Sequence, residues 1–173
     1  MTAPDPVFGE GLVGEEYLPA AFVPRALDAA AGERLVQRAV RLLAVDALLE
    51  EEPVDEDEDP RLARIEAKLG LALEMLGTLA AREALPDVLL RWSSQGVELP
   101  LDGPVAPGTA GVVRIALMPG LPLALELPGN VVRCDAGRAG IRYAHADEAF
   151  ESALARRVFR AHRRAVAQAR RQR

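Results

Sequence analysis

The sequence contains few residues of the kinds that build disulfide or metal frameworks. Its 173 residues include one cysteine, Cys134, and two histidines, His145 and His162. One cysteine excludes an intrachain disulfide, and these three residues are too few for a Cys/His zinc cluster within the chain. Aromatic residues make up only 4% of the chain, so a core must be built mainly from Leu, Val and Ala. We expect neither a structural metal nor a disulfide.

The patterns that mark known catalytic and phosphate-binding sites are also missing. Ser93, Ser94 and Ser152 do not lie in a Gly-x-Ser-x-Gly elbow, and no Gly-rich phosphate loop is present. A hydrolase pair of Cys134 and His145 is the remote alternative. A cysteine at a strand end and a solvated or packed histidine explain these residues more simply. We therefore predict a protein that is not an enzyme, with no catalytic residue and no required cofactor.

Long apolar runs are absent as well. No run of about 18 apolar residues occurs, and the N-terminal residues are acidic instead of basic and apolar. The sequence thus predicts neither a membrane span nor a secretion signal, and we expect a cytoplasmic protein.

Charge is distributed unevenly along the chain, although the net charge is only −5. Residues 1–60 carry 15 acidic and 4 basic side chains, whereas residues 151–173 carry one acidic and 8 basic side chains. Opposite charges at the two ends favour pairing within the chain or between copies, with a strong salt dependence. Nucleic acid would also attract the arginines, but the acidic N-terminal third makes that partner the weaker interpretation.

The first 60 residues predict one helix between two irregular segments. Residues 1–23 contain three Pro and three Gly without a sustained hydrophobic period, and we interpret them as an irregular arm. Residues 24–60 begin with Pro24, and apolar residues then recur every three or four positions, which predicts a helix over about residues 25–51. The helix ends in EEEPVDEDED at 50–59, where proline and eight acidic residues favour an extended linker.

Residues 61–85 have the most regular hydrophobic pattern in the sequence. Apolar residues follow the a and d positions of three heptads, and two more lie beside them: Leu62, Ile65, Leu69, Ala72, Leu76 and Leu79, with Leu73 and Met75. Because this face is wider than one partner helix can cover, it predicts a coiled-coil oligomerisation helix in a bundle of three or four. We expect a homo-oligomer, with a tetramer preferred over a trimer. An amphipathic helix on its own domain's core is the alternative.

Residues 86–173 change to short strands followed by a helix. Apolar runs separated by Gly and Pro begin near Val88, Val97, Gly111, Leu121 and Ile141. Five or six strands at this spacing favour a small antiparallel barrel or sandwich. Asp147 is a candidate N-cap for a C-terminal helix that runs into the arginine-rich end. The expected fold class is α+β: a small antiparallel β-barrel with a C-terminal helix, preceded by two helices.

Several motifs in this segment resemble the PilZ domain, a small bacterial barrel module known mainly as a receptor for cyclic di-GMP. The run Arg91-Trp92-Ser93-Ser94-Gln95-Gly96-Val97-Glu98-Leu99 is similar to the family turn (Asp/Asn)-x-Ser-x-x-Gly-x-x-Leu. Gly-Thr at 108–109, a strand ending at Arg133, and Gly140-Ile141-Arg142-Tyr143 follow in the family's order. The heptad helix before the barrel resembles the atypical tetrameric PilZ proteins of xanthomonads.

The resemblance also implies a nucleotide site that is degenerate in this chain. Ligand-binding members have an Arg-x-x-x-Arg motif just before the first strand, a place that we assign to residues 82–87, which hold one arginine. Arg91 replaces the Asp or Asn of the second motif, whereas Ser93 and Gly96 are kept. We therefore expect cyclic di-GMP to bind weakly or not at all.

The function implied by the resemblance is that of a non-enzymatic regulatory or adaptor protein in cyclic di-GMP-related signalling. It would act in motility, pilus function or virulence through an unidentified signalling or pilus-related protein. The alternative is a working cyclic di-GMP receptor that combines Arg91, Ser93 and Gly96 with arginines from elsewhere in the chain. Titration with cyclic di-GMP separates these two hypotheses.

Overall fold

Six antiparallel strands close into a barrel in the order β1-β2-β3-β6-β5-β4. The computed structural model describes residues 4–50, 69, 70, 72, 85–101, 103–118 and 123–171. Within them the elements are β1 (Gly14–Pro24), α1 (Ala29–Glu50), β2 (Asp87–Trp92), β3 (Gly96–Pro100), β4 (Ala110–Ala116), β5 (Ala124–Asp135), β6 (Arg138–Tyr143) and α3 (Glu148–Arg171). The expected antiparallel barrel and C-terminal helix are confirmed.

The first strand of the barrel corrects the sequence interpretation. Residues 1–23 were expected to be an irregular arm, with the barrel confined to residues 86–173, but β1 belongs to the barrel. Residues 14–19 pair with β2, and residues 20–24 pair with β4 and close the barrel. Among its inward positions only Leu18 and Phe22 are large and apolar. The sequence of β1 therefore shows no clear alternation of apolar and polar residues. The strand forms because it pairs with strands that are distant in sequence.

Two aspartates set the start of the two helices. Asp28 Oδ1 accepts a hydrogen bond from the amide of Ala31 at 2.7 Å, so α1 begins at Ala29, four residues later than predicted. Asp147 Oδ1 accepts one from the amide of Phe150 at 2.8 Å, which confirms the predicted N-cap of α3. A side-chain acceptor at this position pairs an amide that the helix itself leaves unpaired.

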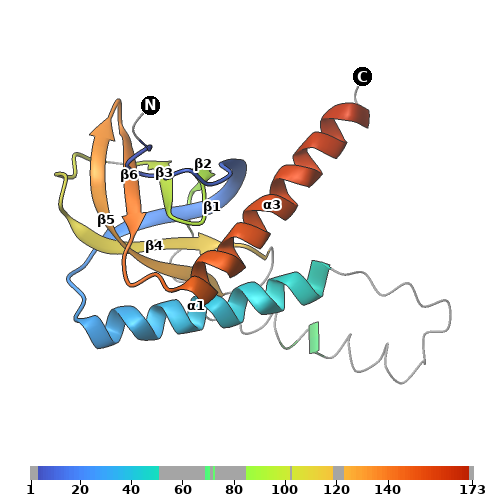
Figure 1. The fold of residues 1–173 in the computed structure, drawn as a ribbon, viewed down its shortest axis with the longest axis horizontal. Helices are drawn as coiled ribbons and strands as arrows, with labels where there is room; N and C mark the ends of the chain where they lie inside the picture. Colours follow the sequence, from blue (N-terminus) through green and yellow to red (C-terminus); the bar gives the residue numbers. More distant parts are fainter. Residues whose placement is uncertain are drawn as a thin grey trace.

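The hydrophobic core fills the barrel and continues under both helices. Side chains of every strand meet Val36, Ala39 and Leu43 of α1 and Phe150, Leu154 and Val158 of α3. The rings of Tyr143 and Phe150 meet edge to face, with their centroids 5.7 Å apart, which anchors α3 against β6. In Figure 1, α1 runs along one side of the barrel, and α3 packs against α1 before its C-terminal half extends past the barrel. No described helix is long and apolar enough to cross a bilayer.

The predicted oligomerisation helix lies almost entirely outside the described residues, as does most of the acidic linker. Of its seam only Leu69 and Ala72 are described, and both are helical and exposed. Leu62, Ile65, Leu73, Met75, Leu76 and Leu79 lie outside the described part of the chain. The coiled-coil assignment therefore stays a prediction.

Candidate functional site

The turn from Ser93 to Gly96, between β2 and β3, is the centre of the PilZ-like motif. The Ser93 hydroxyl is fully buried and accepts hydrogen bonds from the amides of Gln95, at 3.1 Å, and Gly96, at 3.3 Å. The same hydroxyl donates a hydrogen bond to the carbonyl of Phe8 at 3.1 Å. The serine thus shapes the turn and also fastens a segment from the far end of the sequence to it.

That segment, residues 5–9, is here called the N-terminal hook. Asp5 Oδ1 accepts hydrogen bonds from the amides of Val7, at 2.8 Å, and Phe8, at 3.1 Å, and the carbonyl of Asp5 accepts one from Gly9 at 2.9 Å. Gly9 has a φ of 64°, a conformation that glycine adopts without strain. Val7 and Phe8 are buried, with 0% and 4% of their surface exposed. The hook is therefore a folded turn packed against the outside of the barrel.

Two glycines on neighbouring strands make room for the hook. A Cβ atom at Gly96 would lie 2.2 Å from the Val7 carbonyl oxygen, and one at Gly140 would lie 2.4 Å from Val7 Cγ2. Because no side chain can occupy either space, the hook's backbone and Val7 lie directly on β3 and β6. The glycine of the family turn is thus required here by contact with the protein itself.

Arg91, at the position of the family's Asp or Asn, is also held by the chain. Its guanidinium carbon lies 5.3 Å from the centre of the Phe8 ring, a cation–π contact. Its Nε atom lies 3.2 Å from Glu15 Oε1, and one Nη atom lies 3.8 Å from Glu98 Oε1. Arg91 therefore binds the hook and two carboxylates.

Glu98 is the centre of a network of arginines beside the hook. Its carboxylate accepts hydrogen bonds from Arg133, at 2.6 Å, and Arg138, at 2.9 Å. Arg133 also lies 3.5 Å from Asp5 Oδ2, so the network reaches the hook. Burial raises the pKa of Glu98, but the hydrogen bonds and the positive charges of Arg133 and Arg138 together outweigh burial and hold that pKa below its usual value.

Replacing Glu98 tests this network through the pH dependence of stability. A carboxyl group whose pKa is lower in the folded state stabilises the fold above its ordinary pKa, and this contribution disappears as pH falls through the folded pKa. We expect Glu98→Gln to lower Tm at neutral pH and to flatten the loss of Tm between about pH 6 and pH 3. Glu15→Gln, on a more exposed carboxylate, controls for the loss of one charge. If Tm fell equally steeply with decreasing pH in wild type and in Glu98→Gln, the lowered pKa of Glu98 would not contribute to stability and the network would be contradicted.

The structure also moves the place where the Arg-x-x-x-Arg motif is expected. The first barrel strand is β1, so the segment just before it is residues 4–13 and not residues 82–87 as the sequence interpretation assumed. Residues 1–24 contain no arginine or lysine. The hook occupies this place, with a carboxylate at Asp5 and an apolar pair at Val7 and Phe8. Its sequence signal was short: an Asp-Pro pair followed by a glycine, which is typical of a tight turn.

A second charged group, here called the buried ion-pair cluster, joins α3 to β1 and α1. It consists of Glu16, Asp46, Arg157 and Arg160. The two Nη atoms of Arg157 donate to Glu16 at 3.0 and 3.1 Å, and its Nε atom lies 3.1 Å from Asp46. Arg157 also lies over the ring of Trp92, 5.3 Å from its centre. The expected pairing between the two ends of the chain is therefore present within one chain.

The remaining chemical candidates do not come together. Cys134 lies opposite Ala139 at one end of the β5–β6 pair, whereas Tyr143 marks the other end and His145 follows it. Four residues of strand separate the two ends by about 13 Å, so Cys134 and His145 form no catalytic pair. The described residues contain no group of three metal-ligating side chains.

Comparison with known proteins agrees with this architecture. Residues 39–171, well over half of the chain, match the family described as atypical PilZ domain, cyclic di-GMP receptor. A solved structure of a pathogenic protein from Xanthomonas campestris, a tetrameric PilZ domain self-assembled via a helical bundle, is 29% identical and covers 93% of each chain with a TM-score of 0.73. No curated protein matched. From the barrel, its Ser93–Gly96 turn and the match over residues 39–171, we conclude that this chain belongs to the atypical PilZ domain family.

Proposed function

We propose that this chain is an oligomeric, non-enzymatic adaptor of cyclic di-GMP-related signalling whose PilZ turn holds its own N-terminal hook in place of a nucleotide. The observation that carries the proposal is the contact of the hook with the turn. The Ser93 hydroxyl is used by the Phe8 carbonyl, and the space above Gly96 is filled by Val7. Both family residues that the sequence keeps are thus employed by the protein itself.

The charges around the turn support the same proposal. A dianionic ligand with two guanine rings requires convergent cations with free donors. Three arginines around the turn and the hook, Arg91, Arg133 and Arg138, each lie within ion-pair distance of Glu98. Arg142 lies opposite Gly96 in the sheet, but one further arginine does not supply the several convergent cations that such a ligand requires. Binding a phosphate would require breaking these pairs and leaving a poorly solvated carboxylate without partners. This cost argues against the alternative of a working receptor built from recruited arginines.

Isothermal titration with cyclic di-GMP at low salt tests the proposal. Each charge-assisted hydrogen bond that is not made costs about 1.5–3 kcal/mol, so we expect a dissociation constant above about 100 µM. The matched variant is Phe8→Ala, which loosens the hook without changing a charge and should bind no more weakly than wild type. Saturable low-micromolar binding to wild type would overturn the proposal. Arg91→Ala and Ser93→Ala would then identify the groups responsible.

Assembly through residues 61–85 is the second part of the proposal. The wide heptad face, the exposed Leu69 and the tetrameric, helix-bundled relative all support a tetramer. Displaying four barrels on one bundle would multiply weak contacts with a partner protein. We place that partner in motility, pilus function or virulence, as the sequence resemblance implies.

A further inference from the structure

The C-terminal half of α3 is a helix with no cover from the described residues. Every residue from His162 to Arg171 is exposed, and this half extends beyond the barrel (Figure 1). Two large apolar side chains lie on the exposed surface: Phe159, which is 52% exposed, and Val166, which is 38% exposed. Arg164 lies 3.9 Å from Glu16 of β1, but a helical segment of about ten residues with so few tertiary contacts is marginally stable in water. This half is therefore expected to gain stability from a partner.

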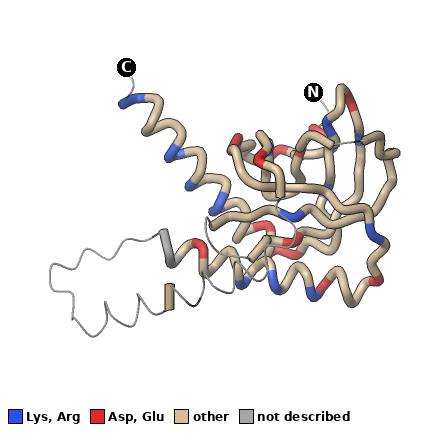
Figure 2. The backbone as a smooth tube through the Cα atoms, turned by 180° about the vertical axis from the view of Figure 1, so that it is seen from behind, with Lys and Arg blue, Asp and Glu red and all other residues tan. Residues whose placement is uncertain are grey.

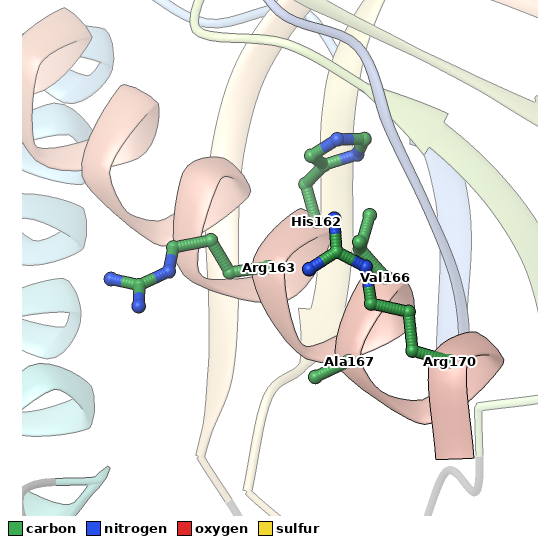
Figure 3. A pocket seen from close by; sticks show the side chains of 5 residues that line it. All are labelled: His162, Arg163, Val166, Ala167 and Arg170. Atoms are coloured by element: carbon green, nitrogen blue, oxygen red, sulfur yellow. The ribbon is translucent and has the colours of Figure 1, made fainter.

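The exposed half forms a basic surface with an apolar centre, here called the α3 surface. An open depression of about 310 Å³ on this helix is lined by His162, Arg163, Val166, Ala167 and Arg170. Figure 3 shows Arg163 extending from one side of the helix and His162, Val166 and Arg170 from the other. Figure 2 shows that basic residues continue along this half to the C-terminus.

The charges on α3 divide the helix into a paired part and an open part. Arg157 and Arg160 bind carboxylates of the buried ion-pair cluster. Among the described residues, no carboxylate forms an ion pair with Arg163 or Arg170. Arg163 instead lies 6.0 Å from the centre of the Phe159 ring. Arg163 and Arg170 thus present positive charge on the α3 surface for which the described residues supply no counter-charge.

The chain itself carries a segment of matching charge that begins close to this surface. Asp46, near the end of α1, lies 3.0 Å from Arg160, and Glu50, one helical turn later, is the last residue of α1. Residues 50–59 then bring eight acidic side chains in ten positions. Ten extended residues span up to about 33 Å, whereas α3 from Arg160 to Arg171 is about 16 Å long. The acidic segment can therefore reach the whole α3 surface.

We propose that the α3 surface is the docking site of the acidic segment, residues 50–59, of the same chain. The short connection from Asp46 gives this segment a high effective concentration at the surface. Single exposed ion pairs contribute little, but several that act together in one segment give a salt-sensitive contact. The inference stands apart from the proposed function, since it does not involve the Ser93–Gly96 turn.

Hydrogen exchange of the full chain tests the docking. Backbone amides of residues 162–171 are measured at low salt and at about 0.5 M NaCl, where exposed charges are screened. We expect exchange to be at least about threefold faster at high salt, because the segment leaves and the helix opens more often. Replacing the acidic residues at 51, 52 and 55–59 by Gln or Asn should cause the same acceleration at low salt. Glu10→Gln/Glu33→Gln/Asp87→Asn, which neutralises exposed acidic residues elsewhere, is the control and should leave exchange unchanged.

A charge exchange completes the test. Arg163→Glu/Arg170→Glu should accelerate exchange of the helix amides. Replacing the acidic residues at 51, 52, 57 and 58 by Arg in this variant should slow exchange again. Equally fast exchange in wild type at both salt concentrations and in the neutralised chain would overturn the proposal. If the protection of residues 162–171 disappeared when the protein was diluted, the acidic segment would come from a second copy, and docking within the same chain would be overturned. Unchanged exchange in β5 confirms in each variant that the barrel is folded.

Discussion

Replacing Arg157 by Ala is expected to lower the free energy of unfolding by about 3–5 kcal/mol, because the buried carboxylate of Asp46 and the partly buried carboxylate of Glu16 lose its guanidinium group. Arg157 is 2% exposed, and Asp46 is 3% exposed. Water therefore cannot replace the guanidinium group that Asp46 loses. The loss of the contact with Trp92 adds to the effect. The substitution should release α3 from β1 and α1, since the buried ion-pair cluster joins all three elements.

Urea unfolding at fixed protein concentration measures this effect through the fluorescence of Trp92, the only tryptophan in the chain. Arg156→Ala is the matched control: it removes the neighbouring arginine of the same helix, which is exposed and whose guanidinium group donates a hydrogen bond to the Ser152 hydroxyl. A surface substitution of this kind is expected to change the free energy of unfolding by no more than about 0.5 kcal/mol. Arg157→Met combined with Glu16→Gln and Asp46→Asn should recover part of the loss, because no buried carboxylate is then left without its arginine, and the side chain of Arg160 is partly exposed to water. Equal effects of the two alanine substitutions would show that the cluster does not stabilise the fold.

The second large effect is expected from the heptad helix. Leu69→Asp/Leu76→Asp places two charges per chain in the predicted seam, and several buried charges in one bundle cost several kcal/mol each. We expect the oligomer to dissociate or the helix to unfold. Leu69 is 60% exposed in the single chain, as expected for a side chain whose neighbours belong to other copies.

Light scattering after size exclusion measures the molar mass of each variant. Ala67→Asp/Thr78→Asp adds the same two charges at outward heptad positions and should keep the wild-type mass. Circular dichroism distinguishes dissociation from unfolding. A wild-type chain that is monomeric at high micromolar concentration would end the oligomer proposal, whatever the variants do.

The arrangement of β5 shows what sequence patterns could not predict at the candidate site. Leu125, Leu127 and Val131 are buried in the core, so strict alternation would also direct Arg133 inward. A bulge between Val131 and Arg133 shifts the register, and Arg133 instead reaches Glu98 on the outer face. Bulges redirect side chains in this way. The arginine network around Glu98 therefore depends on a local break in the strand that composition and period do not reveal.

Short-range signals were sufficient for much of the fold. The N-cap at Asp147, the strands β2 to β6 between Gly and Pro, and the turn from Arg91 to Gly96 follow from contacts between residues a few positions apart. These features were predictable because hydrogen bonding, hydrophobic period and turn chemistry act over such short distances. The barrel and the family resemblance came from the order of these local signals.

The class of the fold, the family turn, and the separation of acidic and basic charge along the chain could all be inferred from the sequence alone. Three features became visible only in the folded chain: β1 closes the barrel, the hook covers Ser93 and Gly96, and Arg157 joins β1, α1 and α3. Each of these features requires residues that are far apart in sequence to meet, and small or polar residues at the contact points carry no periodic signal of that meeting. From the sequence, Gly96 is interpreted as a turn residue; the structure shows in addition that the backbone of Val7 lies against it and leaves no space for a side chain.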